Sequence, residues 1–152
     1  MPNFPGTIKS KLPKVGTTIF TVMSALANEH NAINLSQGFP DFEVSEKLKS
    51  LVKQHLDKSN HQYAPMAGVA KLREQIAKKI EKLYGIKYNP ETEITVTPGG
   101  TMALYSAISA VVNEGDEVVI FAPAYDSYTP AVTLNGGTPI YIPLKAPDFR
   151  IP

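Results

Sequence analysis

Hydrophobic positions recur at helical spacing in three stretches of the first half of the chain. Residues 19–30, 46–58 and 69–84 each place apolar side chains on one face, which predicts three amphipathic helices. Ser45 is expected to cap the second helix, and Gly85 is expected to end the third. Lys and Glu side chains fill the remaining faces of the third helix, which is typical of a solvated surface.

The pattern changes to short strand-like runs in the second half. Residues 93–97 alternate Ile and Val with Thr, residues 117–121 are apolar on both faces, and residues 139–143 form a third run. Helices are expected between these runs, one over residues 101–113 and a shorter one ending near Leu134. The order predicts an α/β fold, a mainly parallel sheet with helices on both faces.

The remaining segments are less regular. Residues 1–17 are rich in Pro, Gly, Lys and Ser, which predicts an extended arm. A short strand is expected at residues 33–36. The loop 37–42 that follows holds two aromatic residues, a glycine and two polar residues around a proline. Such a loop either packs on the body of the protein or lines a substrate site, and these residues alone favour neither.

Composition narrows the class of protein. The 152 residues are 43% hydrophobic and 19% charged with a net charge of +1, as expected for an ordinary soluble domain without a nucleic-acid partner. No stretch is apolar enough to span a membrane, and no signal peptide is visible. Cysteine is absent, which excludes thiolate chemistry and suits a cytoplasmic enzyme. The three histidines show no metal-ligand spacing, so no metal site is predicted.

Gly99, Gly100 and Thr101 follow the predicted strand at residues 93–97 and begin a helix. Free amides at a helix N-terminus bind anions, although glycines in such a turn also serve geometry alone. The turn has no P-loop lysine, and two adjacent glycines do not make a dinucleotide fingerprint. Tyr125 follows the next strand, and ligands of such sheets bind where the strands end. A phosphate beside an aromatic side chain suggests pyridoxal phosphate.

Four motifs in this order resemble the class I/II aminotransferases, which are fold-type-I enzymes that use pyridoxal phosphate. They are residues 33–42, residues 62–68 with Leu72 and Arg73, the turn 99–101 and residues 122–128. The likeness runs from about Thr17 to the last residue. The chain is most similar to the methionine and kynurenine/glutamine aminotransferase branch.

The resemblance implies a fold and a domain division. The chain would form the N-terminal part of the transferase fold that binds pyridoxal phosphate. Residues 1–44 would supply the arm and part of the small domain, and residues 45–152 the first part of the large cofactor-binding domain.

The resemblance also implies a role for each cofactor-binding position. The amides of Gly100 and Thr101 would hold the cofactor phosphate, with Gly99 shaping the turn, and Tyr125 would stack on the pyridine ring. Tyr63 would reach across a homodimer interface to the partner's cofactor phosphate. Without the resemblance, Tyr63 reads as a loop anchor.

The implied substrates are an amino acid, of methionine, glutamine or aromatic/kynurenine type, and a 2-oxo acid. Gly38 would contact the substrate carboxylate through its backbone, and Phe20 and Phe39 would line the substrate pocket. Without the resemblance, Phe20 reads as a core ring.

No catalytic residue is predicted within the chain. The family's Schiff-base lysine, the aspartate that pairs with the pyridine nitrogen and the substrate arginine are expected beyond residue 152, so the chain alone is expected to be inactive. A carbon–sulfur lyase or cyclase of the same fold shares the motifs and stays an alternative. A non-enzymatic regulatory domain is a second, for which Lys9, Lys11 and Lys14 make too small a basic segment.

Overall fold

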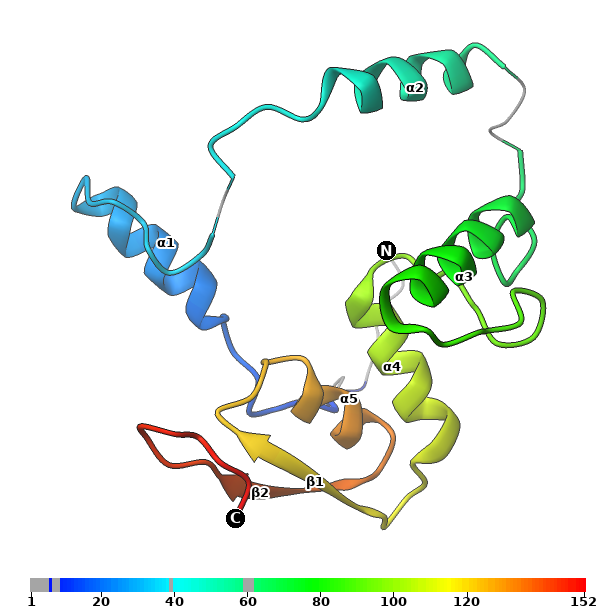
Figure 1. Ribbon diagram of the computed structural model, residues 1–152. Helices are drawn as coiled ribbons and strands as arrows, with labels where there is room; N and C mark the ends of the chain where they lie inside the picture. The colour runs from blue at the N-terminus through cyan, green and yellow to red at the C-terminus, as the bar shows by residue number, and fades with distance from the viewer. Residues whose placement is uncertain (1–5, 7–8, 39, 59–61) are drawn as a thin grey trace. The chain divides into compact units, whose positions relative to one another are not determined.

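The computed structural model describes residues 6, 9–38, 40–58 and 62–152 (Figure 1). They divide into two compact units. One is Asn34–Thr97, and the other joins Met1–Ile33 to Pro98–Pro152. The predicted division into residues 1–44 and 45–152 concerns the family's functional domains, and it stays a prediction.

The unit Asn34–Thr97 contains two helices, α2 (Glu46–Leu56) and α3 (Ala70–Tyr84). Both were expected from the apolar spacing, and Gly85 ends α3 with a positive φ of 71° as predicted. Ser45 occupies the N-cap position of α2 but makes no side-chain capping hydrogen bond.

The first turn of α2 is held by an ion-pair group. Lys49 Nζ lies 2.9 Å from Glu46 Oε1 and 3.0 Å from Glu43 Oε2. The Lys49 ammonium donates hydrogen bonds to the carboxylates of Glu46 and Glu43, and these bonds raise the pKa of Lys49. Because the carboxylates are largely exposed, this group contributes little to stability.

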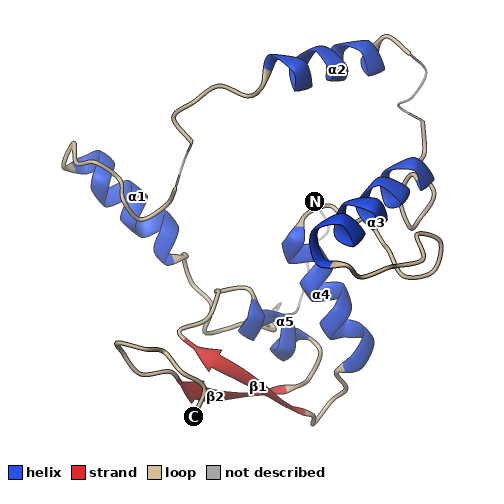
Figure 2. Cartoon of the chain, in the orientation of Figure 1, coloured by secondary structure: helices blue, strands red, loops and turns tan. Residues whose placement is uncertain are grey.

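The other unit contains α1 (Ile19–Glu29), α4 (Gly100–Val111), β1 (Glu117–Ala122), α5 (Tyr128–Leu134) and β2 (Thr138–Pro143) (Figure 2). Thr18 begins α1 as a side-chain cap, because its hydroxyl accepts a hydrogen bond from the Thr21 amide at 3.4 Å. The helix expected at residues 101–113 begins one residue earlier and ends at Val111.

β1 and β2 form a parallel pair, which confirms the parallel sheet predicted from the sequence. Its register runs from Glu117 opposite Thr138 to Ala122 opposite Pro143. The core of the pair lies on the side of α5, where Ile120 and Val132 are buried. Thr129 on α5 also hydrogen-bonds Tyr141 on β2, with 2.7 Å between the hydroxyl oxygens.

The opposite face of this pair is open in the described part of the chain. Val119 and Phe121 on that face are 53% and 39% exposed. Helices on both faces were predicted, and among the described residues only the α5 face is covered.

Two predicted strands are corrected by the structure. Residues 33–36 and 93–97 form no strand, and the described residues contain one sheet, made of β1 and β2. β-Branched alternation suits a strand only where a neighbouring strand supplies the ladder. The Val96 amide instead donates to the Ala67 carbonyl at 3.0 Å, so this segment is fixed by a loop.

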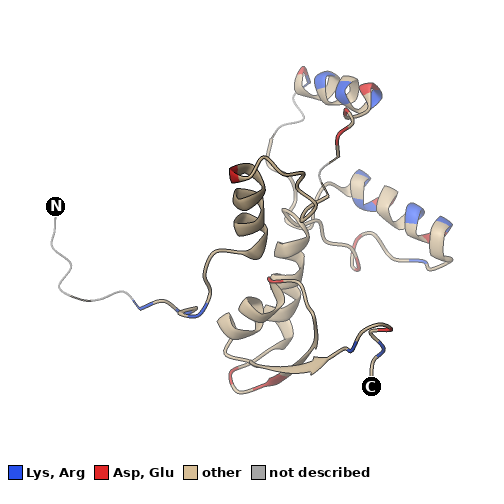
Figure 3. Cartoon of the chain, turned by 90° about the vertical axis from the view of Figure 1, so that its left-hand side faces the viewer, with Lys and Arg blue, Asp and Glu red and all other residues tan. Residues whose placement is uncertain are grey.

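Charged residues are frequent on α2 and α3, where the ribbon is coloured blue and red (Figure 3). By contrast, α4 and α5 contain no charged residue, and α1 contains only Glu29. A helix without a charged face is typical of the interior of a larger protein.

Candidate functional site

The site begins where α4 begins. Gly99 is the N-cap, with φ 97° and ψ 160°, a backbone conformation that is essentially restricted to glycine. Glycine at this position has no side chain to accept from the first-turn amides. A Cβ added at Gly100 would meet no described atom within 4 Å outside its own helix backbone and chain neighbours, so the first turn is open on this side in the described chain. Amides of Gly100 and Thr101 at such a helix start are suited to an anion.

An aromatic cluster follows the carboxyl end of β1. The ring of Tyr125 lies 6.3 Å from the ring of Phe20 on α1, centroid to centroid, and the two planes are tilted by 43°. Tyr128, at the start of α5, meets Tyr125 edge-on with a centroid distance of 6.0 Å. The structure thus brings together Phe20 and Tyr125, two predicted site residues that are far apart in the sequence.

Two neighbours of Tyr125 were not expected at the site. Tyr128 extends the aromatic cluster, and the three-residue spacing of the tyrosines was its signal in the sequence. The hydroxyl of Ser127 is buried with no hydrogen-bond partner in the described residues. A buried hydroxyl is costly to leave unsatisfied, and nothing in the sequence distinguishes this serine from a helix cap.

Gly38 and Tyr63 belong to the unit Asn34–Thr97. Tyr63 is fully exposed, and a Cβ added at Gly38 would meet no atom within 4 Å. Phe39 lies outside the described residues. Tyr63 is therefore not packed as a loop anchor within the described chain.

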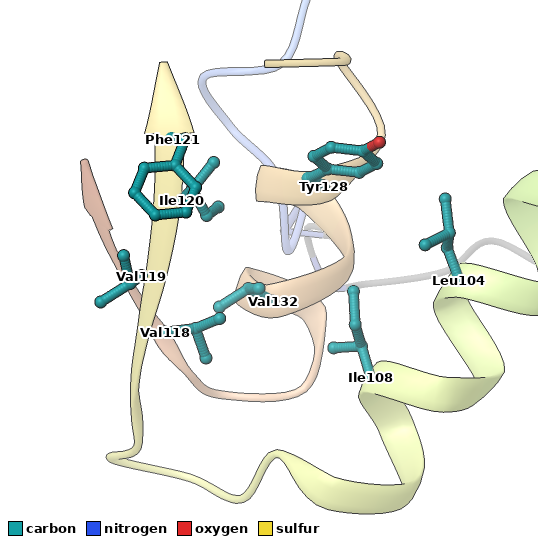
Figure 4. Close-up of a pocket in the computed structure, with 8 residues that line it drawn as sticks. All are labelled: Leu104, Ile108, Val118, Val119, Ile120, Phe121, Tyr128 and Val132. Atoms are coloured by element: carbon teal, nitrogen blue, oxygen red, sulfur yellow. The ribbon is translucent and has the colours of Figure 1, made fainter. Parts of the chain in front are cut away.

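A separate apolar pocket of about 280 Å³ lies between α4, β1 and α5 (Figure 4). It is lined by Leu104, Ile108, Val118, Val119, Ile120, Phe121, Tyr128 and Val132. Only Tyr128 offers a polar group there, and a phosphate requires several donors. This pocket does not fit the predicted cofactor phosphate and is a gap in packing between the elements.

Two features are absent from the part of the chain that the structure describes. No group of three or more His, Asp or Glu side chains is arranged to hold a metal ion. No described helix is both long and apolar enough to cross a membrane.

Comparison with known families identifies the class of protein. The chain belongs to the class I and II aminotransferases, whose family model matches residues 30–151. Enzymes of this family depend on pyridoxal phosphate.

Individual relatives refine the comparison. The chain is 54% identical to the methionine aminotransferase of Escherichia coli K12 over 151 residues, which are 99% of this chain and 39% of that protein. It is 40% identical over 141 residues to a probable N-succinyldiaminopimelate aminotransferase of Mycobacterium tuberculosis, covering 93% of this chain and 35% of the relative.

Solved structures agree with the sequence comparison. The E. coli protein YbdL, identified as having a methionine aminotransferase function, superposes with a TM-score of 0.92 at 53% identity. That match covers 97% of this chain and 39% of the other. The N-succinyldiaminopimelate aminotransferase of M. tuberculosis gives a TM-score of 0.84 at 39% identity, over 93% of this chain and 37% of the other. The chain thus spans about two fifths of the length of these relatives and has the fold of their N-terminal part.

Proposed function

We propose that this chain is the cofactor-anchoring N-terminal part of an enzyme that moves an amino group between an amino acid and a 2-oxo acid. The observation that carries the site assignment is the ring contact between Phe20 and Tyr125, at 6.3 Å. It supports a cofactor-side ring and a substrate-side ring in one place, at the carboxyl end of β1. Family membership supports the reaction class.

The groups near the start of α4 fit pyridoxal phosphate. In this proposal Gly99 shapes the turn, and the amides of Gly100 and Thr101 donate to the phosphate, which the positive end of the helix dipole also attracts. Tyr125 stacks on the pyridine ring and fixes its plane. When bound, the cofactor supplies an electron sink for bond breaking at the amino acid's α-carbon.

The substrate side of the proposal uses three residues. Gly38 contacts the substrate carboxylate through its backbone, since an open surface at this position admits a ligand. Phe20 and Phe39 line the pocket for the amino-acid side chain. The identity with methionine aminotransferase favours a methionine-type substrate over a glutamine or kynurenine type.

The assembly is part of the same proposal. Two copies form a homodimer in the cytoplasm, and the Tyr63 hydroxyl donates a hydrogen bond to the cofactor phosphate of the partner. The full exposure of Tyr63 supports this role, because a side chain that serves another subunit is unpacked in its own.

The lysine that bonds the cofactor is proposed to come from a part of the protein outside residues 1–152. The lysines of this chain lie on the charged faces of α2 and α3, in the arm and in turns. Lys145 lies two residues beyond the carboxyl end of β2, but neither it nor any other lysine of the chain lies in a segment that resembles the family's lysine motif. The chain alone is therefore proposed to bind the cofactor weakly and to lack turnover.

The reaction class is tested with the complete protein that contains this chain. Loaded with pyridoxal phosphate, it should convert L-methionine and a 2-oxo acid to the 2-oxo acid of methionine and the amino acid that corresponds to the acceptor. This rate should be far above the rate at which it releases ammonia and thiol. Tyr125→Ala should lower cofactor affinity in the same preparation. Dominant release of ammonia and thiol would instead establish the lyase alternative.

A further inference from the structure

Arg73 joins two loops of the unit Asn34–Thr97. It lies close to the N-terminus of α3, where a cation is disfavoured by the helix dipole. Its guanidinium donates from Nε to the Gly68 carbonyl at 3.1 Å, and from Nη1 to the carbonyls of Pro90 and, at 3.3 Å, Glu91. Three carbonyl acceptors offset the unfavourable position, and only a planar fork reaches them together.

The first loop bonded by Arg73 is the turn that follows Tyr63. Its amide-to-carbonyl hydrogen bond from Gly68 to Pro65 is 2.8 Å long. The turn also packs closely against the segment that leads towards Gly99. A Cβ added at Gly68 would lie 2.7 Å from the Val96 Cβ, and the Val96 amide donates to Ala67.

The second loop is the turn at residues 89–93, which precedes the same segment. The Glu93 amide donates to the Asn89 carbonyl at 2.9 Å, and the Asn89 amide donates to Glu93 Oε2 at 2.7 Å. The turn is thus closed by its own hydrogen bonds. Arg73 connects this turn to the loop of Tyr63 through its hydrogen bonds to Gly68, Pro90 and Glu91.

We propose that Arg73 is a positioning residue for the cofactor phosphate. It holds the turn that presents Tyr63 and the segment that enters the Gly99 turn in one fixed arrangement. This inference rests on the proposed function, in which both elements serve a cofactor phosphate. It differs from a purely structural anchor because it couples Arg73 to Tyr63.

The test is a double-mutant cycle on cofactor affinity in the complete protein, using Tyr63→Phe, Arg73→Lys and the pair. Tyr63→Phe alone should weaken pyridoxal-phosphate binding about tenfold or more, the loss of one hydrogen bond to an anion. Arg73→Lys keeps the positive charge but removes the planar guanidinium that donates to several carbonyls at once. It should therefore lower the affinity for pyridoxal phosphate by a similar factor. In the Arg73→Lys background, Tyr63→Phe should then cost less than about twofold.

Lys78→Met is the matched control, because it removes a charge from an exposed position on the same helix. The affinity of Lys78→Met for pyridoxal phosphate should equal that of the unmodified protein. Tyr63→Phe should weaken binding by the same factor in the Lys78→Met background as in the unmodified protein. Additive losses for Arg73→Lys and Tyr63→Phe, or an unchanged affinity in Arg73→Lys, would overturn the proposal.

Hydrogen exchange separates this inference from the proposed function. The amides of Gly68 and Val96 should exchange at least about tenfold faster in Arg73→Lys and at the original rate in Lys78→Met. If the unmodified protein binds no pyridoxal phosphate, the proposed function fails. In that case faster exchange would uphold the clamp alone, and unchanged exchange in any case contradicts it.

Discussion

Adjacent glycines at the start of α4 have different requirements. Gly99 has a positive φ of 97° with ψ 160°, which side chains strain. Gly100 has ordinary helical geometry and open space around it. A side chain at Gly99 would therefore act through the backbone, whereas one at Gly100 would act through the space in front of the helix.

Gly99→Ala should lower the free energy of unfolding of the complete protein by about 1–3 kcal/mol, because alanine is strained in this conformation. Gly100→Ala should leave it unchanged or raise it slightly, since alanine is a better helix former than glycine. Chemical denaturation of the two variants measures the difference. Equal stabilities would show that the turn does not need the glycine conformation.

At the scale of elements, the interior of the described chain is the contact of α5 with β1 and β2. Val132 is 1% exposed and lies against the sheet, while the hydrogen bond between Thr129 and Tyr141 closes the edge of the same contact. Tyr125 and Tyr128 lie in and just after the loop that joins β1 to α5. The stability of this contact thus fixes the aromatic cluster.

Val132→Ala should destabilise the complete protein by about 2 kcal/mol, through lost burial and a cavity. Val52→Ala, at a half-exposed position of α2, should cost about 0.5 kcal/mol or less. Thermal or urea unfolding of both variants provides the comparison. A Val132→Ala variant as stable as Val52→Ala would mean that the α5 contact is not part of the core.

Sequence patterns predicted the elements that contain their own hydrogen bonds. The helices α1 to α5 were found close to their expected bounds, because apolar spacing and signals such as Gly85 are local. Residues 93–97 were expected to form a strand and do not. A strand needs a neighbouring strand for its hydrogen bonds, and the local sequence pattern does not show whether one is present. The contact between Phe20 and Tyr125 was not predicted, although the resemblance gave both residues a role at the site. The clamp made by Arg73 had no signal in the spacing of its carbonyl acceptors.

At the scale of the whole molecule, part of the apolar surface of the sheet and of α4 is left exposed by the described chain. One face of the β1–β2 pair is open at Val119 and Phe121, and α4 has no charged side. Exposed apolar sheet surface favours association between chains. The same surface suits further strands and helices, in keeping with relatives more than twice as long.

Residues 1–152 expressed alone should therefore associate at micromolar concentration and unfold at low denaturant concentration. The double variant Val119→Lys, Phe121→Lys should reduce association, and Val52→Lys on the charged helix α2 should not. Light scattering and sedimentation measure both effects. A chain that stays monomeric and well folded without these changes would contradict the expectation.

The proposed dimer makes a prediction about mixed subunits of the complete protein. Tyr63→Phe and Gly100→Val should each impair every site of their own homodimers. A hybrid of the two should regain one intact site, because the unmodified Gly100 of one subunit meets the unmodified Tyr63 of the other. Activity of subunits unfolded and refolded together tests this, and hybrids with no regained activity would place Tyr63 in the site of its own chain.

The central claim is that the first turn of α4 holds the phosphate of pyridoxal phosphate. The direct measurement is a titration of the complete apoprotein with pyridoxal phosphate, comparing Gly100→Val with Gly16→Val. Among the described residues, a Cβ at either glycine would meet no atom within 4 Å beyond its chain neighbours and, for Gly100, the backbone of its own helix, so neither change should clash with this part of the chain. Gly100→Val should weaken binding about tenfold or more, by obstructing the amides that donate to an anion, and Gly16→Val should leave it unchanged. Equal affinities for the two variants would contradict the account.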